Sequence, residues 1–125
     1  MKTKGNAAKI GPWTDTENAI LAHKYLVILD YEKSKKHVNK AQHRREGIAA
    51  MAGARDDKRE RSHGSWEMKM CNASAVMAAA GLPFIQGYKP LGHGQARDLA
   101  RALAVAMLAH GFNDDEIVRM EALTK

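Results

Sequence analysis

The sequence predicts an all-α fold, a compact bundle of about five helices with an ordered Gly/Pro loop between the third and the fourth. Ala and Met are abundant and β-branched residues are few, which favours helices over strands. Apolar residues recur at helical spacing, and capping residues and glycines mark where helices begin and end. The 125 residues suit a single domain over 10–125, preceded by a short basic tail over 1–9 that we expect to be mobile.

The first two helices are predicted from their N-terminal caps. Thr14 precedes acidic residues that suit the first turn of a helix, and we expect this helix to run to about Lys33. Its apolar arc is broad, which predicts that it is the central helix of the fold. Asn39 is the expected cap of a second helix that ends near Ala54.

Three further helices follow in the second half. Ser65 is expected to open a helix through Ala80 that Gly81 stops. The Gly/Pro loop comes next, and a fourth helix is expected from about Gln95 to His110. Its inward side is predicted to carry the large apolar residues Leu99, Leu103, Met107 and Leu108. Asn113 is the expected cap of a last short helix through about Leu123.

The positive charge is concentrated in the first part of the chain. Residues 1–70 contain 15 Lys and Arg against 9 Asp and Glu, whereas residues 71–125 contain 5 of each. The stretch 33–61 alone carries +6, equal to the net charge of the whole protein. Such a stretch attracts polyanions, of which nucleic acid is the commonest, although a solvated charged face is the simpler alternative.

Several classes of protein are disfavoured. No apolar run approaches the roughly 20 residues needed to span a membrane, so we expect no membrane partner and a cytoplasmic location. The lone Cys71 is expected to be a small apolar group, and the six histidines lack the spacing of a zinc site. Because no phosphate-binding glycine loop, dinucleotide fingerprint or serine nucleophile motif is present, we expect no cofactor, no metal and no enzymatic activity.

Polar residues cluster in the segment 61–95, RSHGSWEMKMCNASAVMAAAGLPFIQGYKPLGHGQ. Together with Trp13, Tyr25 and the basic residues near Lys40, this segment resembles an accessory domain at the N-terminus of HNH nucleases and of modification-dependent restriction proteins. The chain departs from that pattern at Trp66, at Met70 and over 91–94, and no HNH module follows. The resemblance therefore implies a stand-alone accessory domain of a restriction, phage or mobile-element system that faces nucleic acid and does not cleave it. The opening Trp13-Thr14-x-x-Glu17 also resembles the start of Myb or SANT-type helical domains.

These observations predict a double-stranded DNA-binding surface at the start of the second and third helices. Basic groups would hold phosphates, serines at a helix N-terminus would cradle one phosphate, and Asn72 would contact a base edge. The alternative for Asn72 and Ser74 is a buried hydrogen-bond network that fixes the loop at 87–89. The predicted surface comprises Lys40, His43, Arg44, Arg45, Arg61, Ser62, Ser65, Lys69 and Asn72, bordered by Tyr88 and Lys89.

Two other functions are compatible with the sequence. The same polar face could instead contact a protein, as an interaction module of a nuclease or phage assembly. A minor alternative is a metal-dependent nuclease that uses Glu67 and Lys69 with Asp56 and Asp57 upstream. The predicted helix argues against the nuclease, because Glu67 and Lys69 would point about 200° apart. The sequence leaves the DNA specificity, the oligomeric state and the pathway open.

Overall fold

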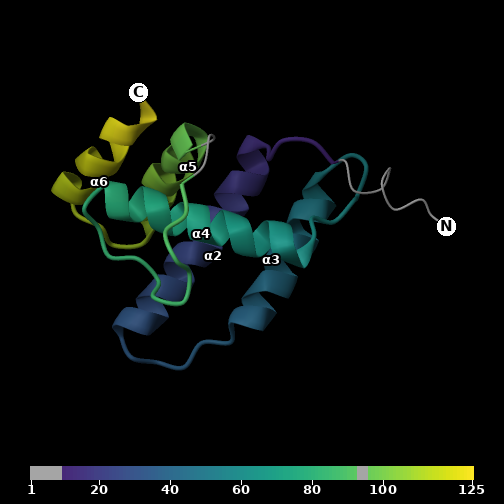
Figure 1. Cartoon of the computed structure of the whole chain (residues 1–125), viewed down its shortest axis with the longest axis horizontal. Coiled ribbons are helices and arrows are strands. Elements are labelled where there is room, and N and C mark those ends of the chain that lie inside the picture. Colours follow the sequence, from purple (N-terminus) through teal and green to yellow (C-terminus); the bar gives the residue numbers. More distant parts are fainter. Residues whose placement is uncertain (1–9, 93–95) are drawn as a thin grey trace.

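The computed structural model describes residues 10–92 and 96–125, so the predicted tail over 1–9 and the expected helix start at Gln95 lie outside it. Over the described residues the chain is all-helical and contains no strand, which confirms the predicted fold class. None of these helices is long and apolar enough to cross a bilayer. The elements are α2 (Asp15–Lys33), α3 (Lys40–Ala54), α4 (His63–Ala79), α5 (Ala96–Ala109), α6 (Asp114–Glu121) and the short 3-10 helix η1 (Ala122–Thr124), as Figure 1 shows.

The helix α2 is the centre of the fold. It contacts α3, α4 and α5, and α4 crosses it in Figure 1. Leu21, Ala22 and Tyr25 on α2 are completely buried. The broad apolar arc of this helix is explained by its neighbours, because α3, α4 and α5 all bury part of it.

The helix ends follow the local signals in the sequence. Thr14 and Glu17 form a capping box at the start of α2, and Asn113 forms one at the start of α6. Asn39 caps α3 by accepting the Gln42 N–H. Gly81 ends α4 with a φ of +73°, a conformation that costs residues other than glycine free energy.

The start of α4 differs from the prediction. The helix begins at His63, and its cap is Ser62, whose Oγ accepts the Ser65 N–H at 3.0 Å. Ser65 therefore lies inside the first turn and does not open the helix. Both serines fit a capping position, and Ser62 is selected because the turn at 63–65 is already helical.

Trp66 is a core residue shared by α3 and α4. Its side chain is completely buried, and a Cβ atom added at Gly47 would overlap its ring. Gly47 thus allows α3 to approach the indole of α4 closely. The residue that departs from the accessory-domain pattern is here a central packing element.

The exposed apolar residues correct one prediction for the fourth helix. Leu99, Leu103 and Met107 of α5 are buried as expected, but Leu108 is 69 % exposed, and its neighbour Val105 is 70 % exposed.

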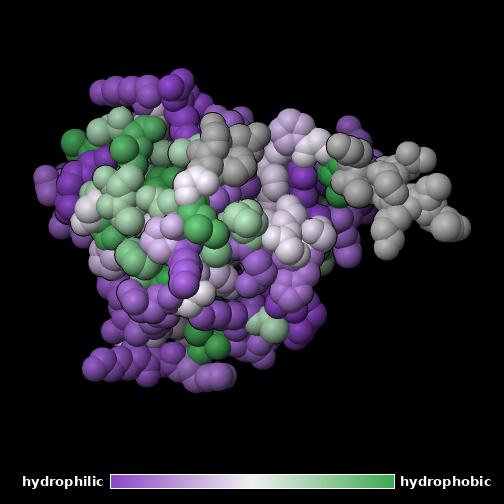
Figure 2. All heavy atoms as spheres, viewed as in Figure 1, coloured by the Kyte–Doolittle hydropathy of each residue, from purple (hydrophilic) through white to green (hydrophobic). Residues whose placement is uncertain are grey.

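In the view of Figure 2, apolar residues gather over α4 and α5, and hydrophilic residues line the lower edge, where α2 and α3 are joined.

Candidate nucleic-acid interface

Arg61 does not lie on the predicted DNA-binding surface, because its guanidinium is used inside the protein. The residue is 8 % exposed. Its Nε and Nη2 donate to the two carboxylate oxygens of Glu17 at 2.9 and 2.8 Å, and its Nη atoms donate to the carbonyls of Gly11 and Pro12. Burial of Glu17 opposes its ionisation, but the hydrogen bonds from Arg61 and Thr14 outweigh burial, so the pKa of Glu17 is lowered. Arg61 fixes the segment before α2.

Lys69 and Ser65 surround Trp13. The Lys69 ammonium lies 5.1 Å from the Trp13 ring centroid, and the Arg61 guanidinium lies 5.2 Å from it. The indole N–H of Trp13 donates to Ser65 Oγ at 3.3 Å. Lys69 is 3 % exposed, and burial, assisted by the charge of Arg61, lowers its pKa. These residues attach the N-terminal segment to α4, and the predicted phosphate contact of Lys69 requires a surface position that it does not have.

Asn72 and Ser74 are both used in hydrogen bonds inside the protein, through two separate sets of partners. The Asn72 amide donates to the carbonyl of Leu91 at 2.6 Å, and Ser74 Oγ hydrogen-bonds the Tyr25 hydroxyl at 2.7 Å. The Tyr25 hydroxyl also accepts the Ile85 N–H at 3.0 Å. Asn72 is 2 % exposed, so the structure favours the network over contact with a base edge. The two sets of hydrogen bonds fix the loop after α4 at Ile85 and Leu91.

Lys40, Arg44, Tyr88 and Lys89 do come together. The Lys40 ammonium lies 5.1 Å over the Tyr88 ring, close to Gly87. Burial raises the pKa of Tyr88 to about 12, and the nearby charge of Arg44 acts in the opposite direction. Tyr88 is only 4 % exposed, so it supports the Lys40 side chain and presents little surface of its own.

The same loop reaches the end of α2. The Gln86 N–H donates to Glu32 at 3.0 Å, which places the loop beside the connection between α2 and α3. That connection carries exposed lysines. We call this end of the molecule the basic pole, and its cations are Lys33, Lys35, Lys36, Lys40, Arg44 and Lys89.

The remaining predicted cations of α3 point elsewhere. His43 and Arg45 are two residues apart, so they project about 200° apart around the helix. His43 lies against Lys24, which is paired with Glu46 at 2.7 Å, and burial followed by the Lys24 charge lowers the pKa of His43. Arg45 lines a shallow hollow with Ser62. The predicted side chains therefore do not form one continuous surface.

Internal ion pairs neutralise much of the charge near 55–61. Arg55 pairs with Asp57 at 2.8 Å and lies 3.6 Å from Glu17, and Arg59 lies 3.4 Å from Asp57. The hydrogen bonds from Arg55 and from the Arg59 N–H hold the pKa of Asp57 well below its usual range. The excess charge that the sequence places over 33–61 is thus partly cancelled at the start of α4.

The cations of the basic pole differ from the arginines near 55–61 in their lack of carboxylate partners. In the part of the chain that the structure describes, none of them has an ion-pair partner. The ammonium of Lys33 lies 5.6 Å from the Phe112 ring centroid and that of Lys40 lies 5.1 Å from the Tyr88 ring centroid, cation–π contacts that bring no carboxylate to either charge.

The residues of the alternative nuclease site are dispersed. Glu67 and Lys69 lie on different faces of α4. A carboxylate oxygen of Glu67 is 4.0 Å from His63 Nε2, whereas Lys69 is buried against Trp13. Asp57 is engaged by Arg55. Within residues 10–92 and 96–125, no group of three His, Cys, Asp or Glu side chains is placed to hold a metal ion.

The sequence reasoning missed the role of Glu17. Its position in a capping box explained its identity completely, so nothing local indicated that its carboxylate would be buried opposite Arg61. Glu17 and Arg61 are 44 residues apart, so no short-range pattern in the sequence indicates that they pair.

Comparison with protein-family models, curated proteins and solved structures finds no match to this chain.

Proposed function

We propose that this protein binds double-stranded DNA through the basic pole. The observation that carries the proposal is the unequal distribution of compensating charge. The acidic groups Glu17 and Asp57 neutralise the arginines beside α4, whereas the cations of the basic pole lack ion-pair partners among the described residues. Unpaired cations gathered from four segments release counterions when they contact phosphates, which favours a polyanionic partner.

The binding mode that this surface supports is phosphate contact. Lysines dominate the pole, and they act as flexible point charges that do not read bases. With Asn72 buried, the pole offers little for the recognition of a base edge. We therefore propose weak sequence preference and strong salt dependence, in a non-catalytic accessory role. The resemblance to accessory domains of restriction proteins supports a restriction, phage or mobile-element setting.

The test is the salt dependence of binding to a short fluorescent DNA duplex, measured by anisotropy. The variant Lys35→Gln/Lys36→Gln removes two charges from the pole, and Arg97→Gln/Arg101→Gln removes two exposed charges from α5 as the matched control. We expect the first variant to reduce the slope of log affinity against log salt by roughly one per lost phosphate contact, and the control to leave the slope unchanged. Salt-insensitive binding, no binding, or equal losses in both variants would contradict the proposal.

A second function, protein interaction, is favoured by a separate observation. Val105, Leu108 and Val118 are 60 to 70 % exposed on α5 and α6. Exposed aliphatic groups of this kind are common at protein interfaces. If the duplex shows no salt-dependent binding, this apolar surface becomes the better candidate, and Leu108→Ser should then weaken association with a nuclease or phage protein without altering the fold.

A further inference from the structure

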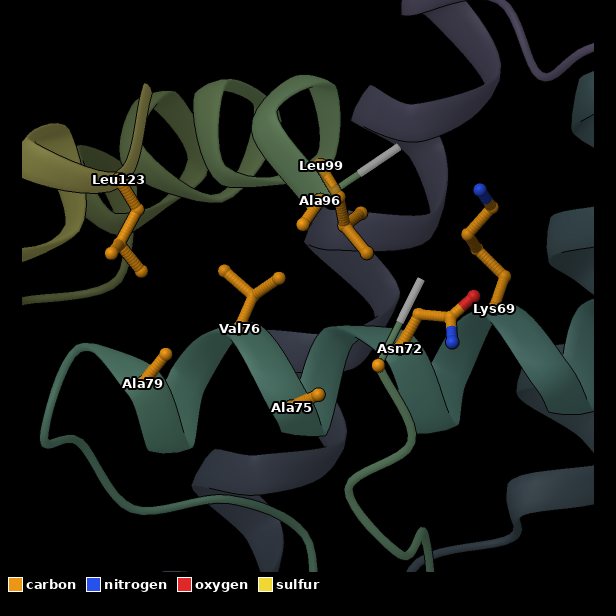
Figure 3. A pocket seen from close by; sticks show the side chains of 9 residues that line it. Lys69, Asn72, Ala75, Val76, Ala79, Ala96, Leu99 and Leu123 are labelled. Atoms are coloured by element: carbon orange, nitrogen blue, oxygen red, sulfur yellow. The ribbon is translucent and has the colours of Figure 1, made fainter. Parts of the chain in front are cut away.

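The two ends of α5 have different surroundings. Near its start, α5 lines a largely apolar cavity of about 300 Å³ with α4 and η1, where the Asn72 amide is already bonded to Leu91 (Figure 3). Directly after its last residue, the chain places His110 beside His23 of α2. The two histidines are 87 residues apart, so their spacing in the sequence does not indicate that they meet.

The two imidazole rings each present one nitrogen to the same place. His110 Nε2 lies 3.0 Å from His23 Nδ1, and the ring centroids are 4.9 Å apart with the planes tilted by 49°. The rings therefore meet at their edges and are not stacked. Two imidazole nitrogens that bind one ion at about 2.0 to 2.1 Å, with an angle of about 90 to 110° between them, are about 2.9 to 3.4 Å apart. The histidine pair already has the separation of a two-nitrogen chelate.

We propose that His23 and His110 bind a divalent transition-metal ion, with His23 Nδ1 and His110 Nε2 as the ligands and Cu²⁺ as the preferred ion. The ion would take the place of the proton that the two rings share in their hydrogen bond. Each neutral ring would then carry its own proton on the remote nitrogen, His23 Nε2 or His110 Nδ1, so the two rings lose no proton on binding. His23 is exposed and His110 is half-buried, so water can complete the coordination.

The ligand type and the geometry determine which ion is preferred. Imidazole nitrogen suits Cu²⁺, Ni²⁺ and Zn²⁺, whereas Mg²⁺ and Ca²⁺ select oxygen ligands. Among the first group Cu²⁺ binds most strongly to a given nitrogen site, and its tetragonal geometry places neighbouring ligands at right angles. Zinc sites usually hold three or four protein ligands, and the described part of the chain supplies no third ligand at this place.

The electrostatic environment of the pair supports this assignment. Burial, followed by the charge of His23, lowers the pKa of His110, so the His110 ring is neutral at neutral pH, which is the form that binds metal ions. The carboxylate of Asp30 acts on His110 in the opposite direction. Its negative charge is too far away to be a third ligand but favours a cation beside the two rings.

The experiment is thermal unfolding of the full chain with added Cu²⁺ or Ni²⁺, without DNA and with EDTA as the metal-free reference. Only the folded chain brings the two histidines together, so an ion that binds both raises the melting temperature. We expect a rise of about 5 to 10 °C when the ion is present at about 100 times its dissociation constant, and no rise with Mg²⁺. No cation of the basic pole takes part, so this outcome is independent of DNA binding.

Three variants assign the effect to the pair. His23→Gln and His110→Gln should each abolish the rise, because one imidazole alone does not chelate. His63→Gln is the matched control, since His63 lies 4.0 Å from Glu67 and is the competing two-ligand position on α4. The control should retain the full rise. The exposed position of His23 allows His23→Gln to fold, which circular dichroism checks, so the test stays decisive even if His110→Gln is unfolded.

Pulsed electron paramagnetic resonance of the equimolar Cu²⁺ complex identifies the ligands, because it detects the remote nitrogen of each bound imidazole. We expect two imidazoles in the wild type and at most one in His23→Gln. The proposal is overturned if neither Cu²⁺ nor Ni²⁺ raises the melting temperature, if His23→Gln retains the full rise, or if His63→Gln loses as much of it as His23→Gln. Two bound imidazoles in the spectrum of His23→Gln would also overturn it.

Discussion

The guanidinium of Arg61 and the carboxylate of Glu17 form a buried two-pronged ion pair, with Nε and Nη2 donating to separate oxygens at 2.9 and 2.8 Å. The pair joins the residue before the cap of α4 to the first turn of α2. Two carbonyls of the preceding segment, those of Gly11 and Pro12, accept further hydrogen bonds from the same guanidinium. One side chain therefore fixes both the start of α4 and the path of the chain into α2.

We expect Arg61→Met to lower the free energy of unfolding by about 3 to 5 kcal/mol, because it leaves the Glu17 carboxylate buried without its partner. Urea denaturation measures the change. The exposed pair of Arg101 with Asp98, 2.9 Å apart, is the control, and Arg101→Met should cost less than about 1 kcal/mol. Equal effects of the two substitutions would show that Arg61 is not a structural residue.

Two glycines of α3 should respond oppositely to alanine. A Cβ at Gly47 would overlap the Trp66 ring, so Gly47→Ala is expected to destabilise the protein by about 1 to 3 kcal/mol. Gly53 has no atom within 4 Å of the added Cβ, and Gly53→Ala should stabilise by about 0.5 to 1 kcal/mol through helix propensity. Thermal denaturation of both variants checks the sign, and stabilisation by Gly47→Ala would contradict the close packing of α3 on α4.

Removing the Tyr25 hydroxyl should loosen the loop after α4. In Tyr25→Phe the buried Ile85 N–H and Ser74 hydroxyl lose a partner, which is expected to cost about 1 to 3 kcal/mol. Hydrogen exchange at the Ile85 amide should then be faster in Tyr25→Phe than in the wild type, and this increase should exceed that at the amides of α2. Tyr31→Phe is the control, because Tyr31 is 40 % exposed. An unchanged exchange rate at Ile85 would show that the Tyr25 hydroxyl does not hold the loop in place.

A histidine pair between α2 and α5 predicts a loss of stability in mild acid. His110 Nε2 lies 3.0 Å from His23 Nδ1, and burial, followed by the charge of His23, lowers the pKa of His110 below its ordinary value of 6.5, although Asp30 acts in the opposite direction. The unfolded chain binds the proton more readily, so the stabilisation is complete above about pH 6.5 and is lost as the pH falls below it. His43, whose pKa is also lowered, contributes in the same direction.

The measurement is the free energy of unfolding at pH values from about 7 to 5. We expect His110→Gln to flatten the pH dependence in this range, since the protonation that opposes folding is removed. His37→Gln is the control, because His37 is exposed in the α2–α3 connection. A pH profile that His110→Gln leaves unchanged would rule out the pair as its origin.

Several features of the fold could be read from neighbouring residues alone. Thr14, Asn39 and Asn113 were predicted as helix caps, and all three accept the expected backbone N–H groups. Gly81 was predicted to end its helix and does so with a positive φ. These are interactions within four residues, so the sequence contains both partners in one short window.

The candidate site was harder to predict, because basic residues of the same type differ in burial and in the side chains they contact. Arg61 and Lys69 became internal, Lys40 and Arg44 joined Tyr88 and Lys89, and His43 and Arg45 were directed to separate sides of α3. A basic run indicates excess charge, but it does not indicate which cations find carboxylates elsewhere in the chain.

By itself, the sequence determined the helices, their caps and stops, the central place of α2 and the concentration of positive charge in the first part of the chain. Only the tertiary structure decided that Glu17 neutralises Arg61 across 44 residues, that Asn72 and Ser74 fix a loop, and that uncompensated cations gather at one pole. The reason is physical. Caps and helical periodicity depend on short-range hydrogen bonds and spacing, whereas burial and charge compensation depend on which distant segments pack together.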